Sequence, residues 1–242
     1  MAAQTRNDLT IYDTVAADWW SGDVRWVRTL KNMVPARLKH FDRYVEWAGL
    51  DVLDLGCAGG FMAEAISDLG ARVEGIDPAA DAIAAARTHA DETGRHIGYQ
   101  VGVGESLPYS NGAFDAVVCV DVLEHVADLD RVLAEVARVL RPGGWFLFDT
   151  INRTALARLA VVTMGENVFR LLPKGTHDPA LFIRPADLRA RLSDAGFNVE
   201  RFAGLGPIGI NKRGDPVFGR LPFTGVIYMG AARLCQVKTD EP

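Results

Sequence analysis

Between residues 51 and 150, short apolar segments alternate with longer segments whose apolar residues recur at helical spacing. Apolar segments such as 51–56 and 72–77 end in glycine or aspartate, as strands do before a turn. Strands that alternate with helices form parallel sheets, and the connecting helices cover both faces of such a sheet. The alternation therefore predicts an α/β fold with a doubly wound, mostly parallel sheet.

The chain of 242 residues is long enough for one large α/β domain, and we expect a single domain with four parts. The alternation breaks after Thr150, where a long segment precedes the next clear helix. An insertion at the carboxyl end of a strand lies where ligands bind in doubly wound sheets. The expected parts are a helical cap at 1–48, a sheet-forming core at 49–150, a lid insertion at 151–183, and a C-terminal helix with strands at 184–234.

The cap is predicted to contain two helices. Apolar residues from Val24 to Val34 recur at helical spacing. Pro35 suits the first turn of a second helix, because no N–H donor is needed there, and Gly49 is suited to ending it. We therefore expect a break in the helix at Pro35.

Charge and cysteine usage narrow the function classes. The formal net charge is −5, whereas nucleic-acid-binding domains are more often basic, so we expect no nucleic-acid partner. The three cysteines are odd in number and lie in apolar surroundings, which favours a reducing cytoplasm over a disulfide framework. No apolar run in the sequence reaches the length of a membrane span.

The segment "VLDLGCAGG" carries the strongest functional signal. Its strand ends at Leu55, and glycines from Gly56 to Gly60 form a turn into a helix, where a ligand can approach the backbone. Asp77 ends the next strand, at the offset of carboxylates that accept hydrogen bonds from a ribose. The spacing lacks the G-x-G-x-x-G of dinucleotide sites, and the acidic Asp54 suits the sulfonium cation of S-adenosylmethionine. The alternative is a glycine turn that only packs the helix on the sheet.

Together with "VEGID", "ESLPYSNGAFDAVVCVDVLEHV" and "LRPGGWFLFDT", this segment resembles the ordered motifs of class I S-adenosylmethionine-dependent methyltransferases over residues 50–150. The resemblance implies a Rossmann-like sheet of seven strands with S-adenosylmethionine as cofactor. The family's middle glycine is Ala58 here, and we expect a negative φ at Ala58, because alanine at positive φ costs about 1 kcal/mol. Val103 replaces an acidic residue before the adenine pocket, so adenine contacts are expected at its neighbours. The predicted cofactor-binding residues are Arg37, Asp54, Gly56, Cys57, Ala58, Gly60, Asp77, Pro78, Gly104, Glu105 and Val120.

Four further segments, "YDTVAADWW", "LKNMVPAR", "DTINRT" and "LPKGTHDPALFIRPADL", resemble the bacterial ubiquinone-biosynthesis O-methyltransferases over residues 11–234. This resemblance implies methylation of a phenolic or catechol hydroxyl on an aromatic ring that carries a polyprenyl chain. It also implies that Arg37 holds the cofactor carboxylate, the alternative being a solvated helix residue. Lys31 and Val34 replace a His and an Asn of the family pattern near the expected mouth of the site. The alternative substrate is therefore another small aromatic metabolite, methylated on O, N or C.

The segment "CVDVLEHV" offers a candidate metal site. If it begins a helix, Asp121, Glu124 and His125 share one face, because residues three and four apart are neighbours on a helix. Two carboxylates and an imidazole are ligands for Mg²⁺ or Zn²⁺ beside a catechol, and similar clusters in the resembled family are linked to divalent cations. The alternative is that these residues serve packing and the electrostatics of the helix start. His125 is also a candidate catalytic residue.

The segment "PKGTHDP" offers a candidate general base. Imidazole side chains suit proton transfer near neutral pH, so His177 is expected to take the phenolic proton, with Asp178 orienting its ring. The alternative is the polar tip of a loop, in which Asp178 starts a turn before Pro179 and Thr176 bonds locally. Thr176 is not expected to be a nucleophile, because the methyl group passes directly from sulfur to substrate.

Residues 155–172 are apolar with basic neighbours, which is typical of a lid that covers an apolar substrate. The same pattern suits an amphipathic segment that contacts a membrane, so peripheral attachment at the inner membrane face is a second reading. The sequence is compatible with a monomer or a homodimer. A nicotinamide-dependent reductase and a cofactor-binding protein without catalysis are the alternatives from other classes.

Overall fold

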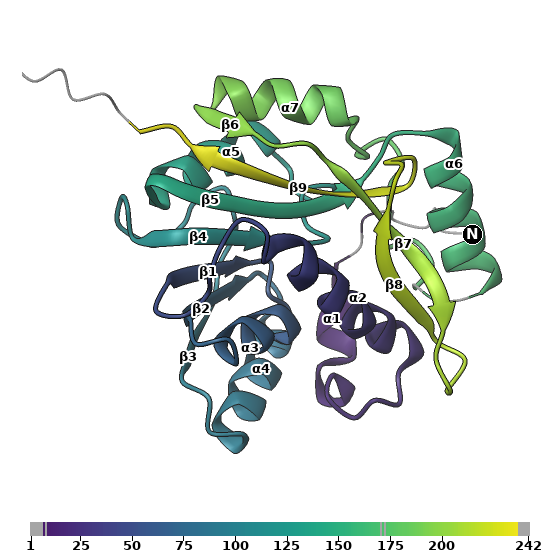
Figure 1. Cartoon of the computed structure of the whole chain (residues 1–242). Helices are drawn as coiled ribbons and strands as arrows, with labels where there is room; N and C mark the ends of the chain where they lie inside the picture. Colours follow the sequence, from purple (N-terminus) through teal and green to yellow (C-terminus); the bar gives the residue numbers. More distant parts are fainter. Residues whose placement is uncertain (1–6, 8, 170, 172, 237–242) are drawn as a thin grey trace, which may run out of the picture.

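A twisted sheet of nine strands separates two layers of helices in the computed structural model, which describes residues 7, 9–169, 171 and 173–236 (Figure 1). The strand order is β3-β2-β1-β4-β5-β9-β7-β8, and β6 pairs with β9. The strands are β1 (Asp51–Leu55), β2 (Arg72–Asp77), β3 (Ile97–Val101), β4 (Phe114–Cys119), β5 (Leu140–Ile151), β6 (Phe197–Val199), β7 (Ala203–Ile210), β8 (Pro216–Leu221) and β9 (Ile227–Leu234).

The five strands from β1 to β5 are parallel, as the alternation predicts. At the centre, Val52 of β1 pairs with Val73 on one side and with Ala116 on the other, and all three are buried. Central strands of this kind are apolar on both faces because helices cover both faces. The doubly wound, mostly parallel sheet is therefore confirmed.

Each face of the sheet has its own set of helices (Figure 1). One face packs against α2 (Arg25–Phe41), α3 (Phe61–Ser67) and α4 (Ala80–Glu92). The other face packs against α5 (Leu129–Val139) and α7 (Pro185–Asp194), whose buried side chains meet Val117 and Phe146 of the sheet. These helices cover the faces of the sheet and not the carboxyl ends of the parallel strands, which lie near the cap and the lid.

The expected count of seven strands is wrong, because the C-terminal part contains an additional hairpin. β6 and β7 lie one after the other along β9, and β7 then pairs antiparallel with β8. The hairpin is tied to α2, where the Arg28 guanidinium donates to both carboxylate oxygens of Asp215 at 3.0 Å. Glycine and proline are frequent in residues 204–219, and such residues favour turns, so the sequence did not indicate this hairpin.

The expected break at Pro35 is also wrong, since α2 runs from Arg25 to Phe41 with Pro35 inside it. A proline in a helix interior costs about 3 kcal/mol through a lost hydrogen bond and a steric conflict. Burial of Val34 and Phe41 in the core offsets this cost, as do the two ion pairs of Arg37 described below.

The cap and the lid lie near the carboxyl ends of the strands. The cap contains α1 (Ile11–Thr14), η1 (Ala16–Asp18) and α2, and the lid contains α6 (Ala155–Ala157) and the π-helical η2 (Arg158–Val168). In Figure 1 the lid lies beside the β7–β8 hairpin. Within the described part of the chain, we find no helix that is long and apolar enough to cross a membrane.

Candidate active site

A cavity of about 400 Å³ lies at the carboxyl ends of β1, β2 and β4. Pockets of roughly 300–1,000 Å³ accommodate small molecules and cofactors. Ten of the eleven predicted cofactor-binding residues line it, and Gly60 does not. The ten are Arg37, Asp54, Gly56, Cys57, Ala58, Asp77, Pro78, Gly104, Glu105 and Val120.

The glycine turn after β1 is held by backbone hydrogen bonds. The amides of Gly56 and Cys57 donate to the carbonyl of Ile76, at 2.8 and 3.2 Å, and the Ala58 amide donates to the Asp77 carboxylate at 2.9 Å. These bonds leave Ala58 with a φ of 43°, so the expected negative φ is wrong. Tertiary contacts with β2 fix the turn and offset the conformational cost of about 1 kcal/mol at Ala58.

Gly60 serves packing at the start of α3. Its φ is 93°, and a Cβ built there would lie 2.4 Å from the Tyr99 hydroxyl. Only glycine combines this conformation with so close an approach. Gly60 therefore shapes the turn that its neighbours present to the cavity.

The two carboxylates of the cofactor motif lie in different environments. Asp77 accepts hydrogen bonds from the amides of Ala58 and Ala79. Asp54 is 1% exposed, and among the described residues neither of its oxygens has a hydrogen-bond partner. Burial raises the pKa of Asp54 to about 7. A buried carboxylate without a partner is costly, so this wall of the cavity favours a cationic ligand.

The cap forms one wall of the cavity, and it contributes three residues there that the sequence analysis did not single out. Leu9, Tyr12 and Trp19 line it together with the predicted turn. Burial raises the pKa of Tyr12, and the Asp121 carboxylate raises it further. Val34 of α2 also lines the cavity, whereas the Lys31 ammonium lies over the Trp20 ring, 4.8 Å from its centroid.

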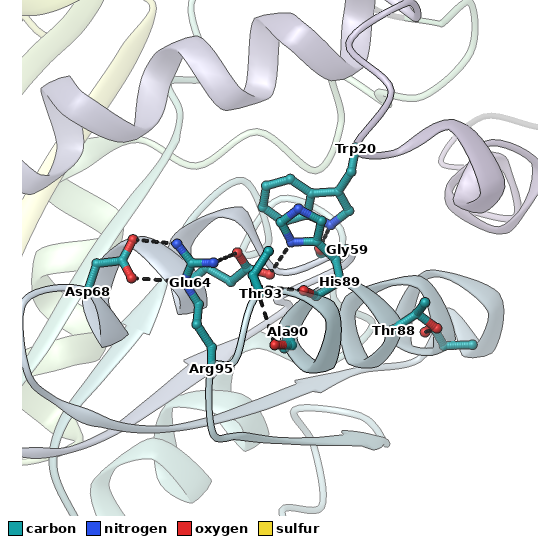
Figure 2. A network of polar contacts seen from close by, with 10 residues as sticks. Trp20, Gly59, Glu64, Asp68, Thr88, His89, Ala90, Thr93 and Arg95 are labelled. Carbon is teal, nitrogen blue, oxygen red and sulfur yellow. Dashed lines mark hydrogen bonds and ion pairs between the residues drawn. The ribbon is translucent and has the colours of Figure 1, made fainter.

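Trp20 joins the cap to the glycine turn and to α4 (Figure 2). Its indole N–H donates to the carbonyl of Gly59 at 3.0 Å. Its ring lies flat on the His89 imidazole, with centroids 3.6 Å apart, and His89 Nδ1 lies 2.7 Å from a Glu64 oxygen. Arg95 completes the network by pairing with Glu64 and Asp68. The cap is thus attached to the segment that forms the floor of the cavity.

Arg37 is 2% exposed, so the reading of it as a solvated residue is wrong. Its guanidinium donates to Asp149 at 2.6 Å and to Asp121 at 2.5 Å, from Nε and Nη2. Burial alone would lower the pKa of Arg37, but the two carboxylates raise it above its ordinary range. The side chain is thus a fixed positive charge on the cavity wall.

A buried polar cluster lies beside the cavity, with different members from those expected. Glu124, His125 and His177 place ligand atoms within 4.8 Å of one another. Residues 121–128 form turns and not a helix, so the expected shared helix face is wrong. Asp121 instead pairs with Arg37 and does not join the cluster. His177 takes that place because the lid folds back over the strand ends.

The imidazole of His177 is held by Glu166 of η2. Glu166 Oε1 lies 2.9 Å from His177 Nδ1 and also accepts from the His177 amide at 3.1 Å. The expectation that Asp178 orients this ring is therefore wrong, because an Asp178 oxygen accepts from the Ala180 amide within the loop. The Thr176 hydroxyl donates to the carbonyl of Pro173, as the loop reading expects.

Two atoms of the cluster are buried without hydrogen-bond partners among the described residues, namely Glu124 Oε1 and His125 Nε2. The other Glu124 oxygen accepts from the Thr150 hydroxyl at 2.7 Å. Burial raises the pKa of Glu124 to about 8, and the Asp121 charge contributes to this increase. Burial lowers the pKa of His125 to about 3, so its imidazole is neutral near pH 7. Buried polar atoms without partners are uncommon and point to a ligand.

Comparison with known proteins agrees with this geometry. Residues 53–148 match the family model of a methyltransferase domain. An S-adenosylmethionine-dependent methyltransferase of Thermotoga maritima, described as a possible histamine N-methyltransferase, shares the fold with a TM-score of 0.65. The two chains are 18% identical, over 92% of this chain and 97% of that one.

Sequence relatives are more specific than the fold. The ubiquinone biosynthesis O-methyltransferase of Thiobacillus denitrificans is 39% identical over 82% of this chain and 85% of its own length. The enzyme of the same name from Chromobacterium violaceum is 39% identical over 93% of this chain and 96% of its own. These similarities set aside the reductase alternative. The chain is a class I S-adenosylmethionine-dependent methyltransferase and belongs to the family of ubiquinone biosynthesis O-methyltransferases.

Proposed function

We propose that this enzyme transfers a methyl group to a phenolic hydroxyl of a catechol whose ring carries a polyprenyl chain, as in a quinone precursor. The observation that carries the proposal is the buried cluster of Glu124, His125 and His177 at the edge of the cofactor cavity. A phenol has a pKa near 10, so methylation at neutral pH needs a group that accepts or displaces its proton.

The cavity fits S-adenosylmethionine. When bound, this cofactor supplies an activated methyl group on a sulfonium centre. The Asp54 carboxylate, which has no hydrogen-bond partner in the described part of the chain, provides negative charge toward a cationic ligand, and Asp77 is the proposed acceptor for ribose hydroxyls. Gly104 and Glu105 line the part of the cavity proposed for the adenine. Arg37 remains the proposed partner of the cofactor carboxylate and, through its ion pairs, fixes Asp121 on the same wall.

His177 is the proposed general base. When its Nδ1–H donates to Glu166, the remaining ring nitrogen, Nε2, carries a lone pair that can accept a proton. Glu166 fixes the ring and stabilises the charge that the imidazole gains. This arrangement of a base and an orienting carboxylate is a recurrent one in catalytic sites.

A divalent cation fits the same cluster. Two imidazoles and one carboxylate favour Zn²⁺ over Mg²⁺, which prefers oxygen ligands. A bound cation would supply positive charge that favours the phenolate. His177 Nε2 cannot hold a metal and accept a proton at once, so the two roles exclude each other. Assays after chelation distinguish the two roles. Full activity without metal would exclude a catalytic role for the cation and would support His177 as the base.

The test of the proposed function is a turnover screen with S-adenosylmethionine and catechols, with and without a short prenyl chain. We expect an O-methylated product and preference for the prenylated catechol. His177→Gln is expected to lower kcat by about 10²-fold or more, the usual contribution of a general base. Methylation on carbon or nitrogen would favour the alternative substrate class, and unchanged turnover in a folded His177→Gln variant would exclude the base.

The lid is the proposed contact with a lipid-tailed substrate and with the membrane that holds it. Four side chains of the lid, Leu156, Leu159, Val168 and Phe169, are about half exposed. Phe223 and Leu156 flank the same glycine, Gly225, so the apolar surface continues onto the neighbouring loop. With a net charge of −5, membrane binding should depend on apolar contact more than on anionic lipids.

Co-sedimentation with neutral liposomes tests this membrane contact, and the variant carries Leu159→Ser and Phe169→Ser together. Equal sedimentation of both proteins would remove the membrane role.

A further inference from the structure

We propose that Asn7 is a positioning residue for His125, and this inference rests on the proposed function of the cluster. Asn7 lies in the cap before α1, and its side chain contacts the imidazole of His125 in the cluster. His125 Nδ1 and Asn7 Oδ1 lie 2.5 Å apart. No sequence pattern pointed to Asn7, because it lies 118 positions before its partner.

The second contact of the same side chain determines the direction of this hydrogen bond. Asn7 Nδ2 donates to the carbonyl oxygen of His125 at 3.1 Å. A carbonyl only accepts, so the amide nitrogen must face it and Oδ1 must face the ring. The ring nitrogen that meets Oδ1 therefore carries the proton, and His125 is in the Nδ1–H tautomer.

This tautomer determines what His125 offers to the cluster. With the proton on Nδ1, the lone pair is on Nε2, which is buried and has no partner among the described residues. That lone pair can bind a metal or accept a hydrogen bond from a substrate hydroxyl. Ligating histidines commonly donate their second nitrogen to an oxygen in this way, which fixes the ring and its tautomer.

Asn7 also connects the cluster to the lid. Its backbone amide donates to the carbonyl of Gly175 at 3.0 Å, and the Gly175 amide in turn donates to Glu166 at 2.8 Å. The two imidazoles of the cluster are thus oriented by oxygens from segments that contact each other. Asn7 has a φ of 60°, a conformation that asparagine adopts more readily than most other residues.

The test uses Asn7→Gly and Asn7→Asp in the full-length enzyme. Glycine keeps the positive φ and removes both side-chain contacts, and aspartate keeps the acceptor for Nδ1–H. Ser21→Ala is the matched control, because the hydrogen bonds of the Ser21 hydroxyl with described residues, to Asp18 and Asp23, lie within the cap loop. Nitrogen NMR of the ring, assigned with His125→Gln, reads the tautomer in the protein without cofactor, metal or substrate.

We expect a pure Nδ1–H tautomer in the parent enzyme and in Asn7→Asp, and loss of that state in Asn7→Gly. The kcat of Asn7→Gly should fall by about 10–100-fold with little change in KM for S-adenosylmethionine, and aspartate should restore much of it. An unchanged tautomer in Asn7→Gly would overturn the inference, as would a higher KM with an unchanged kcat. If the parent enzyme methylates no catechol but Asn7→Gly still loses the Nδ1–H tautomer, the proposed function fails and the positioning role of Asn7 stands.

Discussion

Glu166 and His177 are joined twice, through the ring nitrogen Nδ1 at 2.9 Å and through the backbone amide at 3.1 Å. Both residues belong to the lid, and both are buried. The lid thus carries an imidazole and the carboxylate that orients it to the edge of the cofactor cavity. In the proposed function, the segment that covers the substrate is therefore the one that also carries the base.

The first prediction concerns this pair. Glu166→Gln should lower kcat by roughly 10-fold or more, because a neutral amide cannot stabilise the charged imidazole. The glutamine NH₂ would also face the N–H donors that now bind the Glu166 carboxylate. Asp178→Asn is the matched comparison, since its oxygen can still accept from Ala180. Steady-state kinetics with saturating cofactor measure both. An equal loss in the two variants would return the orienting role to Asp178.

The second prediction concerns Asp54, whose pKa is raised to about 7 in the folded protein by burial. The ordinary value for Asp is near 3.9, so the folded state binds the proton more tightly than the unfolded state. The contribution of Asp54 to the free energy of unfolding should therefore fall as pH rises from about 4 to about 7, and change little above that. Asp54→Asn lacks this titration and should be the more stable protein at pH 8, by on the order of a few kcal/mol.

The measurement for Asp54 is the difference in unfolding free energy between the two proteins at pH 5 and pH 8, without cofactor. Using the difference removes the contributions of other buried carboxylates, such as Glu124. The same substitution should weaken binding of S-adenosylmethionine about 10-fold or more, and should weaken binding of the demethylated product less, because that product lacks the sulfonium charge. A stability difference that does not change with pH would show that Asp54 keeps its ordinary pKa.

The third prediction concerns Trp20, which donates to Gly59 and stacks on His89. Trp20→Phe removes the donor and keeps an aromatic ring, so KM for S-adenosylmethionine should rise about 2- to 10-fold with kcat nearly unchanged. Thr88→Ala is the control, because Thr88 lies next to His89 on α4 (Figure 2) and its hydroxyl donates to the carbonyl of Ala84 in the same helix. A fall in kcat without a change in KM would contradict the expectation that Trp20 supports the glycine turn for cofactor binding.

The fourth prediction concerns Ala58, which has a φ of 43°. Ala58→Gly removes the steric cost of this conformation, so the free energy of unfolding should rise by up to about 1 kcal/mol. The gain is limited because glycine also makes the unfolded chain more flexible. Chemical denaturation measures it, and a clearly less stable variant would show that the turn is not strained.

The sequence by itself determined the features that depend on neighbouring residues. The alternation of apolar strands with helices predicted the parallel sheet, and the glycine turn with Asp54 and Asp77 predicted residues that line the cavity. These features lie on adjacent strands and turns, where side-chain period and backbone conformation follow from local composition. They were therefore readable from the residues alone.

Tertiary structure decided which distant residues meet. His177 joined Glu124 and His125, Asn7 reached His125, and Arg37 took Asp121 out of the predicted cluster. The β7–β8 hairpin formed in a glycine-rich segment through its pairing with β9 and its ion pair to α2. Each of these contacts joins residues far apart in the chain, and no periodicity encodes them, because their partners are chosen by packing of the lid, the cap and the sheet.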